Sequence, residues 1–447
     1  MSAHKGFSFS QDQLREIAQD VLRYAREGGA SASDVDVTEG WGHSVSVRQR
    51  EIDTLEYNRD KGVSITVYLG QRRGHASTSD FSASALQDTV KAALSIARFT
   101  AEDPAAGLPE AATLAREPRE LSLYHPWEVE VTDSIELARR CEAAGLEVSD
   151  EIANSEGASV STQQSQFVMA NSLGFCEGFS SSRHSLGCSL IASRDDEMQR
   201  DDWWVSKRNA AELPDVEAVG EYAARRALAR LGSRKLATCE APVLFEAPLA
   251  TGLLGHFVSA ASGGALYRRT SFLLDQLGEQ IFSKNVTLID DPFLQRGLGS
   301  GWFDDEGVAT QQRTVVDQGM LKGWFLSTYS GRKLGLASTG NSGGSHNLML
   351  QPGKEGFNAL LRRMGRGLLV TELLGSGVNY VTGDYSRGAA GFWVEDGEIA
   401  YPVEEITIAG NLRDMFRNIE ACGSDLLVRG GKICGSILIG NMTIAGD

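Results

Sequence analysis

The sequence predicts an α+β protein, because helical and strand-like periodicities occur in separate blocks. In the first half, a stretch with helical spacing precedes alternating, strand-like segments, and this order occurs twice. In the second half, glycine turns separate many short strand-like runs. We therefore expect helices with antiparallel sheets in the N-terminal half. In the C-terminal half we expect mostly antiparallel β structure with a short apolar helix.

The first predicted element is a helix over residues 10–29. Leu14, Ile17 and Val21 recur at helical spacing, Ser10 is a candidate N-cap, and two glycines end the pattern. The further elements expected in this block are strand-like segments at residues 35–37, 44–47, 65–69 and 74–79 and a helix at 84–98.

A similar order returns after a proline-containing connector at residues 102–118. Asp133 is the candidate N-cap of the next helix. The elements expected after it are strands at 159–163, 167–170 and 185–192, a turn at 171–174 and a helix at 215–231. Helix followed by hairpins thus appears at 10–80 and at 133–195, which indicates an internal duplication of layout without residue-by-residue repetition.

The pattern of the sequence changes at residues 232–240, which we interpret as a domain boundary. The elements expected beyond it are a strand at 243–246, an apolar helix at 250–261 and strands at 286–289, 312–316, 321–326, 391–394, 398–402, 405–409, 436–439 and 442–444. We expect three segments: an N-terminal α+β segment (1–125), a middle α+β segment that packs with it (126–238), and a β-rich C-terminal domain (239–447).

The charge balance argues against nucleic acid as a direct partner. The 447 residues contain 43 Lys and Arg against 59 Asp and Glu, a formal net charge of −16, which repels a phosphate backbone. The six cysteines form no C-x-x-C pair and the first residues lack an apolar signal region, so we expect a cytoplasmic protein. The uncharged run 247–267 is interrupted by glycines, which favours a buried helix over a membrane span.

Two glycine-rich motifs match catalytic patterns only formally. Residues 340–344 read G-x-S-x-G, but no helix is expected after the serine, so a tight turn is the better interpretation. Residues 297–301 lack the lysine of a phosphate-binding loop and indicate a flexible loop.

Two acidic groups stand close to these motifs. They are Asp290–Asp291 and Asp304-Asp305-Glu306. Neither has the spacing of a calcium loop. We expect solvated turns, and the alternative is a set of acids around a peptide-binding cleft.

His256 on the apolar helix and the run 380–392 complete the candidates. Thr251 and Gly252 precede His256 where a metalloprotease helix would carry its other ligand and its base, so a structural histidine is expected. The run 380–392 surrounds Asp384, Tyr385 and Arg387 with glycines, and we interpret it as a loop that a ligand backbone approaches closely.

Taken together, these segments resemble the TldD/PmbA family and, within it, the PmbA (TldE) branch. The resemblance rests on five runs, at 250–278, 303–324, 327–344, 383–412 and 434–446, among them ATGLLGHFVSAASGGALYRRTSFLLDQLG and CGSILIGNMTIAG. It implies a cytoplasmic zinc protease built from TldD and TldE chains. It also implies roles in microcin leader removal and antitoxin degradation, and a name derived from a proposed modulation of DNA gyrase.

The resemblance also implies which residues stand at the metal site. The metal-binding TldD branch has a His-Glu-x-x-x-His helix, which aligns with residues 251–256. Thr251 then replaces the first histidine, Gly252 replaces the catalytic glutamate, and His256 matches the second histidine. Cys422 stands near the position of a late metal-binding cysteine. With these replacements, this chain is expected to hold no cofactor, while zinc resides in a TldD partner.

Three classes of function stay open at this point. The first is a non-catalytic subunit that forms a heterodimer with a TldD-type chain, or a homodimer, and binds peptide substrates through Asp384, Tyr385 and Arg387. The second is a stand-alone metallopeptidase. The third is a binding protein that modulates gyrase by protein contact.

Overall fold

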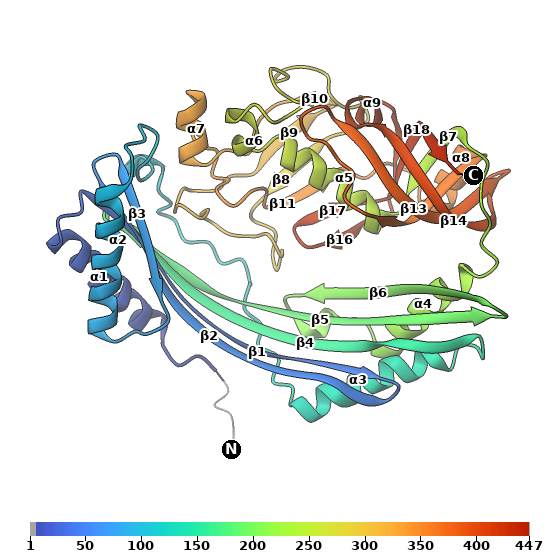
Figure 1. Ribbon diagram of the computed structural model, residues 1–447, viewed down its shortest axis with the longest axis horizontal. Helices are drawn as coiled ribbons and strands as arrows, with labels where there is room; N and C mark the ends of the chain where they lie inside the picture. The colour runs from blue at the N-terminus through green and yellow to red at the C-terminus, as the bar shows by residue number, and fades with distance from the viewer. Residues whose placement is uncertain (1–5, 447) are drawn as a thin grey trace.

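The computed structural model describes residues 6–446 and shows an α+β architecture in two halves. The first half is a long, curved sheet with helices on its convex side. The second half is β-rich and faces the concave side of that sheet (Figure 1). The predicted fold class is therefore confirmed.

The first half consists of two blocks with the same order of elements. The first block contains α1 (Gln11–Glu27), β1 (Ala32–Arg48), β2 (Glu51–Leu69), β3 (Arg72–Thr78) and α2 (Ala83–Phe99). The second contains α3 (Val131–Leu146), β4 (Ile152–Asn171), β5 (Cys176–Arg194), β6 (Glu197–Lys207) and α4 (Val216–Ala229). The duplication of layout that the sequence indicated is thus present.

The two blocks share one antiparallel sheet in the order β3-β2-β1-β4-β5-β6. In strand β1, Val35, Val37, Val45 and Val47 are buried under the helices, and Asp34 and Asp36 point to the opposite, concave face. Helix α1 begins at Ser10, whose side chain and that of Gln13 form a capping box.

Three expectations for this half were wrong. The strand-like segments at 159–163 and 167–170 belong to one strand, β4. The strand-like segments at 35–37 and 44–47 are one continuous strand, because the polar and glycine residues between them still pair with β2 and β4. Helix α3 is preceded by Glu130 rather than by Asp133, which lies within its first turn. An acid in the first turn favours the helix electrostatically without capping it.

The second half contains two further sheets. Its elements are β7 (Cys239–Phe245), α5 (Ala247–Ala260), α6 (Gly263–Tyr267), β8 (Leu288–Asp291), β9 (Arg313–Asp317), β10 (Met320–Leu321), α7 (Thr328–Leu334), β11 (Asn347–Leu350), α8 (Phe357–Met364), β12 (Gly367–Leu374), β13 (Asp384–Glu395), β14 (Glu398–Asn411), α9 (Leu412–Arg417), β15 (Ile419–Cys422), β16 (Leu427–Arg429), β17 (Lys432–Cys434) and β18 (Ile437–Ala445).

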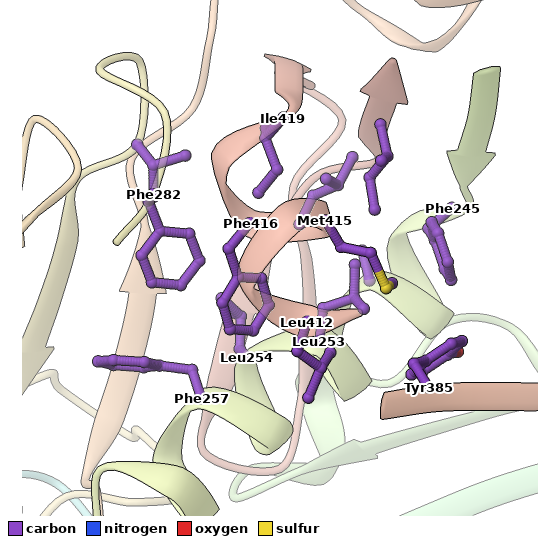
Figure 2. Packing of buried hydrophobic residues seen from close by; sticks show 14 of the residues in the cluster. Phe245, Leu253, Leu254, Phe257, Phe282, Tyr385, Leu412, Met415, Phe416 and Ile419 are labelled. Atoms are coloured by element: carbon purple, nitrogen blue, oxygen red, sulfur yellow. The ribbon is translucent and has the colours of Figure 1, made fainter. Parts of the chain in front are cut away.

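One of these sheets closes on itself. Its order is β14-β13-β12-β7-β18-β15, and β14 also pairs with β18. The other has the order β10-β9-β8-β11-β17-β16. Aromatic and aliphatic side chains from α5, α9 and the closed sheet meet in the largest core cluster (Figure 2).

The two halves meet at two zones, one near each end of the curved sheet. At one end, Arg226 and Arg230 of α4 form ion pairs with Glu246 (2.8 Å) and Glu372 (2.5 Å). At the other, Phe303 packs among aromatic rings of β4, β5 and the turn between them. Across residues 6–446, no helix is long and apolar enough to cross a membrane.

Candidate functional site

Helix α5 carries three of the residues that the sequence placed at a possible metal site. It follows β7 directly, has Pro248 in its first turn, and buries Leu253, Leu254 and Phe257 in the core (Figure 2). Thr251 donates its hydroxyl to the carbonyl of Pro248 at 2.7 Å. Its side chain is therefore used within the helix itself.

Gly252 lies one turn before His256, on the same side of α5. It is exposed, and a Cβ atom built there would meet nothing within 4 Å. The glycine is thus not required by packing. Where a metalloprotease helix would carry its glutamate, this helix presents no functional group.

His256 lies in a cluster with Tyr380, Tyr385 and Arg387. Its Nδ1 is 3.0 Å from the Tyr380 hydroxyl, and its ring meets that of Tyr385 edge-on at 5.9 Å between centroids. Burial, reinforced by the positive charge of Arg387, lowers the pKa of His256 to about 4. The imidazole is therefore neutral at pH 7.

Two polar groups of this cluster lack a hydrogen-bond partner among the described residues: the Tyr385 hydroxyl and Nε of Arg387. Tyr385 is only 1% exposed, and burial raises the pKa of its hydroxyl to about 12. Arg387 is half-buried, with one contact from Nη2 to the carbonyl of Leu373 at 3.4 Å. The cluster thus combines a guanidinium with unsatisfied donors, a combination that suits a carboxylate or a peptide carbonyl.

The run 380–392, interpreted from its glycines as a loop, forms a strand from Asp384 onward. Strand β13 pairs with β12 and β14, and Gly391 is required there because a Cβ would approach the carbonyl of Leu369 within 1.9 Å. Gly391 thus serves close contact between β12 and β13.

Asp384 lies apart from the other two predicted substrate residues. Tyr385 and Arg387 share one face of β13, whereas Asp384 points to the opposite face. It accepts hydrogen bonds from Thr382 (2.6 Å) and Asn411 (3.1 Å), which lower the pKa of its carboxyl. An ion pair between Asp384 and Arg387 across a turn, the simple structural alternative, is therefore not formed.

Cys422 lies at the end of β15, and its thiol is buried. Burial raises the pKa of this thiol to about 12, so it is protonated at neutral pH. A thiolate is the form that binds zinc. Within residues 6–446, no three His, Cys, Asp or Glu side chains are grouped so that they could hold a metal ion. The donor set around His256 thus does not fit a catalytic zinc site, which takes three protein ligands.

The acids at 290–306 were expected in solvated turns, and for most of them this was wrong. Asp290, Asp291 and Asp304 are buried. Asp290 accepts hydrogen bonds from the side-chain amide of Asn341 and from the backbone amide of His346. Asp304 accepts hydrogen bonds from three backbone amides, those of residues 306, 308 and 342. Backbone amides that need acceptors explain why these carboxylates are inside.

Both glycine-rich motifs are turns or loops, as expected. In residues 340–344 the side-chain amide of Asn341 closes the turn on the carbonyl of Gly344 at 2.9 Å. Residues 297–301 form a loop without a following helix. Neither motif presents a nucleophile or a phosphate site.

Known proteins resemble this chain over nearly its full length. Family models for PmbA/TldA metallopeptidase domain 1, central domain and C-terminal domain match residues 33–97, 124–231 and 238–446. The metalloprotease PmbA of Escherichia coli O157:H7 is 47% identical over 436 residues, covering 97% of each chain.

Two solved structures show the same fold. A candidate modulator of DNA gyrase from Bacteroides thetaiotaomicron superposes with a TM-score of 0.92 at 27% identity, over 97% of this chain and 99% of that one. TldE from Thermococcus kodakarensis superposes with a TM-score of 0.85 at 22% identity, over 96% of this chain and 100% of that one.

Proposed function

Because the chain belongs to the PmbA/TldD metallopeptidase family, in its PmbA branch, we propose that it is one subunit of a two-chain zinc metalloprotease. In this assembly a TldD-type partner supplies the metal and the catalytic base. This chain helps to hold an extended peptide substrate and does not itself cleave it.

The observation that carries this proposal is the chemistry of α5 around His256. Gly252 lies one turn before the neutral imidazole of His256, and the hydroxyl of the preceding residue, Thr251, donates a hydrogen bond to the carbonyl of Pro248. Activation of water by zinc needs a bound metal and a base within reach. The helix keeps the position of such a site but lacks the groups that perform the chemistry.

The cluster of His256, Tyr380, Tyr385 and Arg387 supports a binding role. Arg387 is half-buried beside a neutral imidazole and retains an unsatisfied Nε. We assign to it the contact with a peptide carboxylate or carbonyl. Tyr385 is buried and positions its neighbours, and Asp384, on the opposite face, stays a separate candidate contact.

The test is a peptidase assay on this chain, on its TldD-type partner and on the two mixed. We expect cleavage of an unstructured peptide only in the presence of the partner, and the strongest cleavage in the mixture. Zinc analysis of the isolated chain, purified without chelator, is expected to give less than one metal per chain.

A cross-mixing control separates the two subunits. Each subunit is stripped of metal with a chelator, desalted, and mixed with its untreated partner. Stripping this chain should leave the activity of the mixture unchanged, and stripping the partner should abolish it. Cleavage by this chain alone, or loss of activity when only this chain is stripped, would favour the stand-alone metallopeptidase instead.

A further inference from the structure

A cavity of about 490 Å³ lies between the curved sheet and the second half of the chain. It is bounded by the ends of β1, β2 and β3, by the connector after α2, by the loop that carries Asp305 and Glu306, and by α7. Figure 1 shows β3 and α7 facing each other at this end of the molecule. Its volume is in the range of small-ligand sites.

Five carboxyl groups line this cavity, and they come from both halves of the protein. Asp34 and Asp36 come from the concave face of β1, and Asp305 and Glu306 come from the loop opposite. Among the described residues of the lining, Arg73 is the single cationic side chain. The fifth acid of the lining, Asp103, is held by Lys333 and Tyr329, each at 2.7 Å.

The carboxyl group of Asp36 is the least compensated of these. It accepts no hydrogen bond from the described residues, whereas the buried Asp290 and Asp304 accept several each. Burial and the nearby charges of Asp34 and Asp305 raise the pKa of Asp36 to about 7. Burial likewise raises the pKa of Asp34 to about 6, although Thr66 and Arg73 oppose this. A carboxyl group with a purely structural role would be expected to accept a hydrogen bond from the protein. The carboxyl group of Asp36 instead lines the cavity.

A second polar group in the lining also lacks a partner. Asn171 is only 4% exposed, and its Oδ1 accepts from the backbone amides of Leu173 and Phe175. Its amide nitrogen has no acceptor among the described residues, and Asn171 belongs to the lining of the cavity. The cavity thus offers an unused donor next to unused acceptors.

The remaining walls are largely apolar, with Met169, Leu108 and Pro109 beside the ring of Tyr68. Within residues 6–446 no acids here or elsewhere are grouped so that they could hold a metal ion. A ligand that satisfies this lining carries a positive charge on an apolar stem and a carbonyl oxygen within a few bonds. Lysine and arginine residues and a peptide N-terminus have this combination.

We propose that this cavity binds a cationic group of a peptide, an ammonium or a guanidinium, between Asp34, Asp36 and Asp305, with Asn171 donating to an adjacent carbonyl. This inference rests on the proposed function in that the peptide is the substrate of the assembly. It adds a preference for positively charged residues in that substrate.

The test measures binding of short, C-terminally labelled peptides to the full chain by fluorescence anisotropy. One peptide is N-acetylated and contains a single lysine, one has a free N-terminus and norleucine in place of lysine, and one is both acetylated and norleucine-substituted. We expect the lysine peptide, the peptide with the free N-terminus, or both to bind at least about tenfold more tightly than the peptide that carries neither charge. Their order identifies the source of the cation.

The variant Asp36→Asn combined with Asp305→Asn is expected to remove this preference without weakening the neutral peptide. Glu136→Gln is the matched control, because Glu136 is an exposed acid of helix α3 outside the cavity. Equal binding of all three peptides, or an unchanged preference in the double variant, would overturn the proposal.

A stability measurement guards against misfolding of the variant. The folded pKa of Asp36, about 7, lies above the ordinary value of about 3.9. The unfolded chain ionises this group at about pH 3.9 and the folded chain only at about pH 7, so the stability that protonated Asp36 contributes falls as the pH rises from about 4 to about 7 and is absent above that. Asp36→Asn should accordingly raise the melting temperature at pH 8 while it weakens binding. Reduced melting and reduced binding together would indicate damage to the fold and count against the proposal.

The two proposals fail in different ways. If the mixture with a TldD-type partner cleaves the neutral peptide but no peptide shows a charge preference, only the cavity assignment fails. If the charged peptides bind to the chain and the mixture cleaves none of them, only the proposed function fails.

Discussion

At the scale of single residues, Arg387 adds to the effect that burial has on the pKa of His256. Its charge opposes protonation of the imidazole, and its Nε has no hydrogen-bond partner among residues 6–446. A guanidinium that only stabilised the fold would be expected to use its donors. The unused donor is the reason to test Arg387 in binding.

Arg387→Ala is expected to weaken peptide cleavage by the mixed complex by about tenfold for each 1.4 kcal/mol of lost contact. The same change removes a positive charge beside His256, so the pKa of His256 should rise from about 4 toward its ordinary value. Steady-state kinetics measures the first effect, and an NMR titration of the imidazole measures the second.

Arg387→Lys separates charge from geometry. It keeps the positive charge, so the His256 titration should stay low, but it loses the planar donor fork. If Arg387→Ala cleaves as well as the wild type while the His256 titration moves, Arg387 is only an electrostatic neighbour and the substrate assignment fails.

The candidate site was predictable from sequence only in part. The positions of Thr251, Gly252 and His256 on one helix followed from apolar spacing and from the family resemblance. The contact between His256 and Arg387 could not be predicted, because it joins α5 to a strand 131 residues later in the chain. The sequence did not indicate Asp34 and Asp36 as site residues, because acids that alternate with valines are typical of any half-buried strand.

At the scale of elements, two glycines in helices have opposite meanings. Helices α3 and α4 cross so closely that a Cβ on Gly220 would lie 1.8 Å from the backbone carbonyl of Cys141. A Cβ on Gly252 of α5 would meet nothing within 4 Å. The same substitution should therefore act in opposite directions at the two positions.

Gly220→Ala is expected to destabilise the protein by about 1–3 kcal/mol, because α3 and α4 must move apart. Gly252→Ala should stabilise it by about 0.5–1 kcal/mol, since alanine costs less backbone entropy in a helix. Urea unfolding of both variants checks this. Equal and small effects would mean that the α3–α4 contact is looser than the structure indicates.

Strand lengths were the weakest part of the sequence-based prediction. Polar and glycine-rich stretches inside β1 and β4 divided each into fragments, although neighbouring strands on both sides hold them continuous. Strand β14 was predicted as two strands, at 398–402 and 405–409, and it is one strand with a bulge at which Glu405 adopts a positive φ of 53°. Long-range pairing decides such lengths, and local patterns do not contain it.

At the scale of the whole molecule, the exposed sheet edge lies in the first half. The abundance of strands in the second half suggested that its edges associate with another chain. The pairing of β14 with β18 closes one of the two sheets there, and the other sheet ends at two short strands, β10 with two residues and β16 with three. Strand β2, in contrast, pairs with β3 only over residues 63–69, and residues 51–61 are exposed. Strand β1 pairs with this segment along one edge, but among residues 6–446 no strand pairs along its other edge.

We predict that the chain associates through this segment, with a second copy when alone and with a TldD-type subunit when one is present. Ile52, Leu55 and Tyr57 are 47%, 52% and 44% exposed there, an apolar row beside unpaired backbone groups. Light scattering at micromolar concentration should show a dimer. Leu55→Asp should shift it toward monomer, because it places a charge in an interface that buries this row.

Leu374→Asp is the matched control, since Leu374 of β12 is also 52% exposed but lies in the second half. It should leave association unchanged. Dissociation by Leu374→Asp and not by Leu55→Asp would place the interface in the second half, as strand content alone had suggested. A monomer at micromolar concentration, with and without the partner, would contradict association through either surface and, with it, the two-chain assembly on which the proposed function depends.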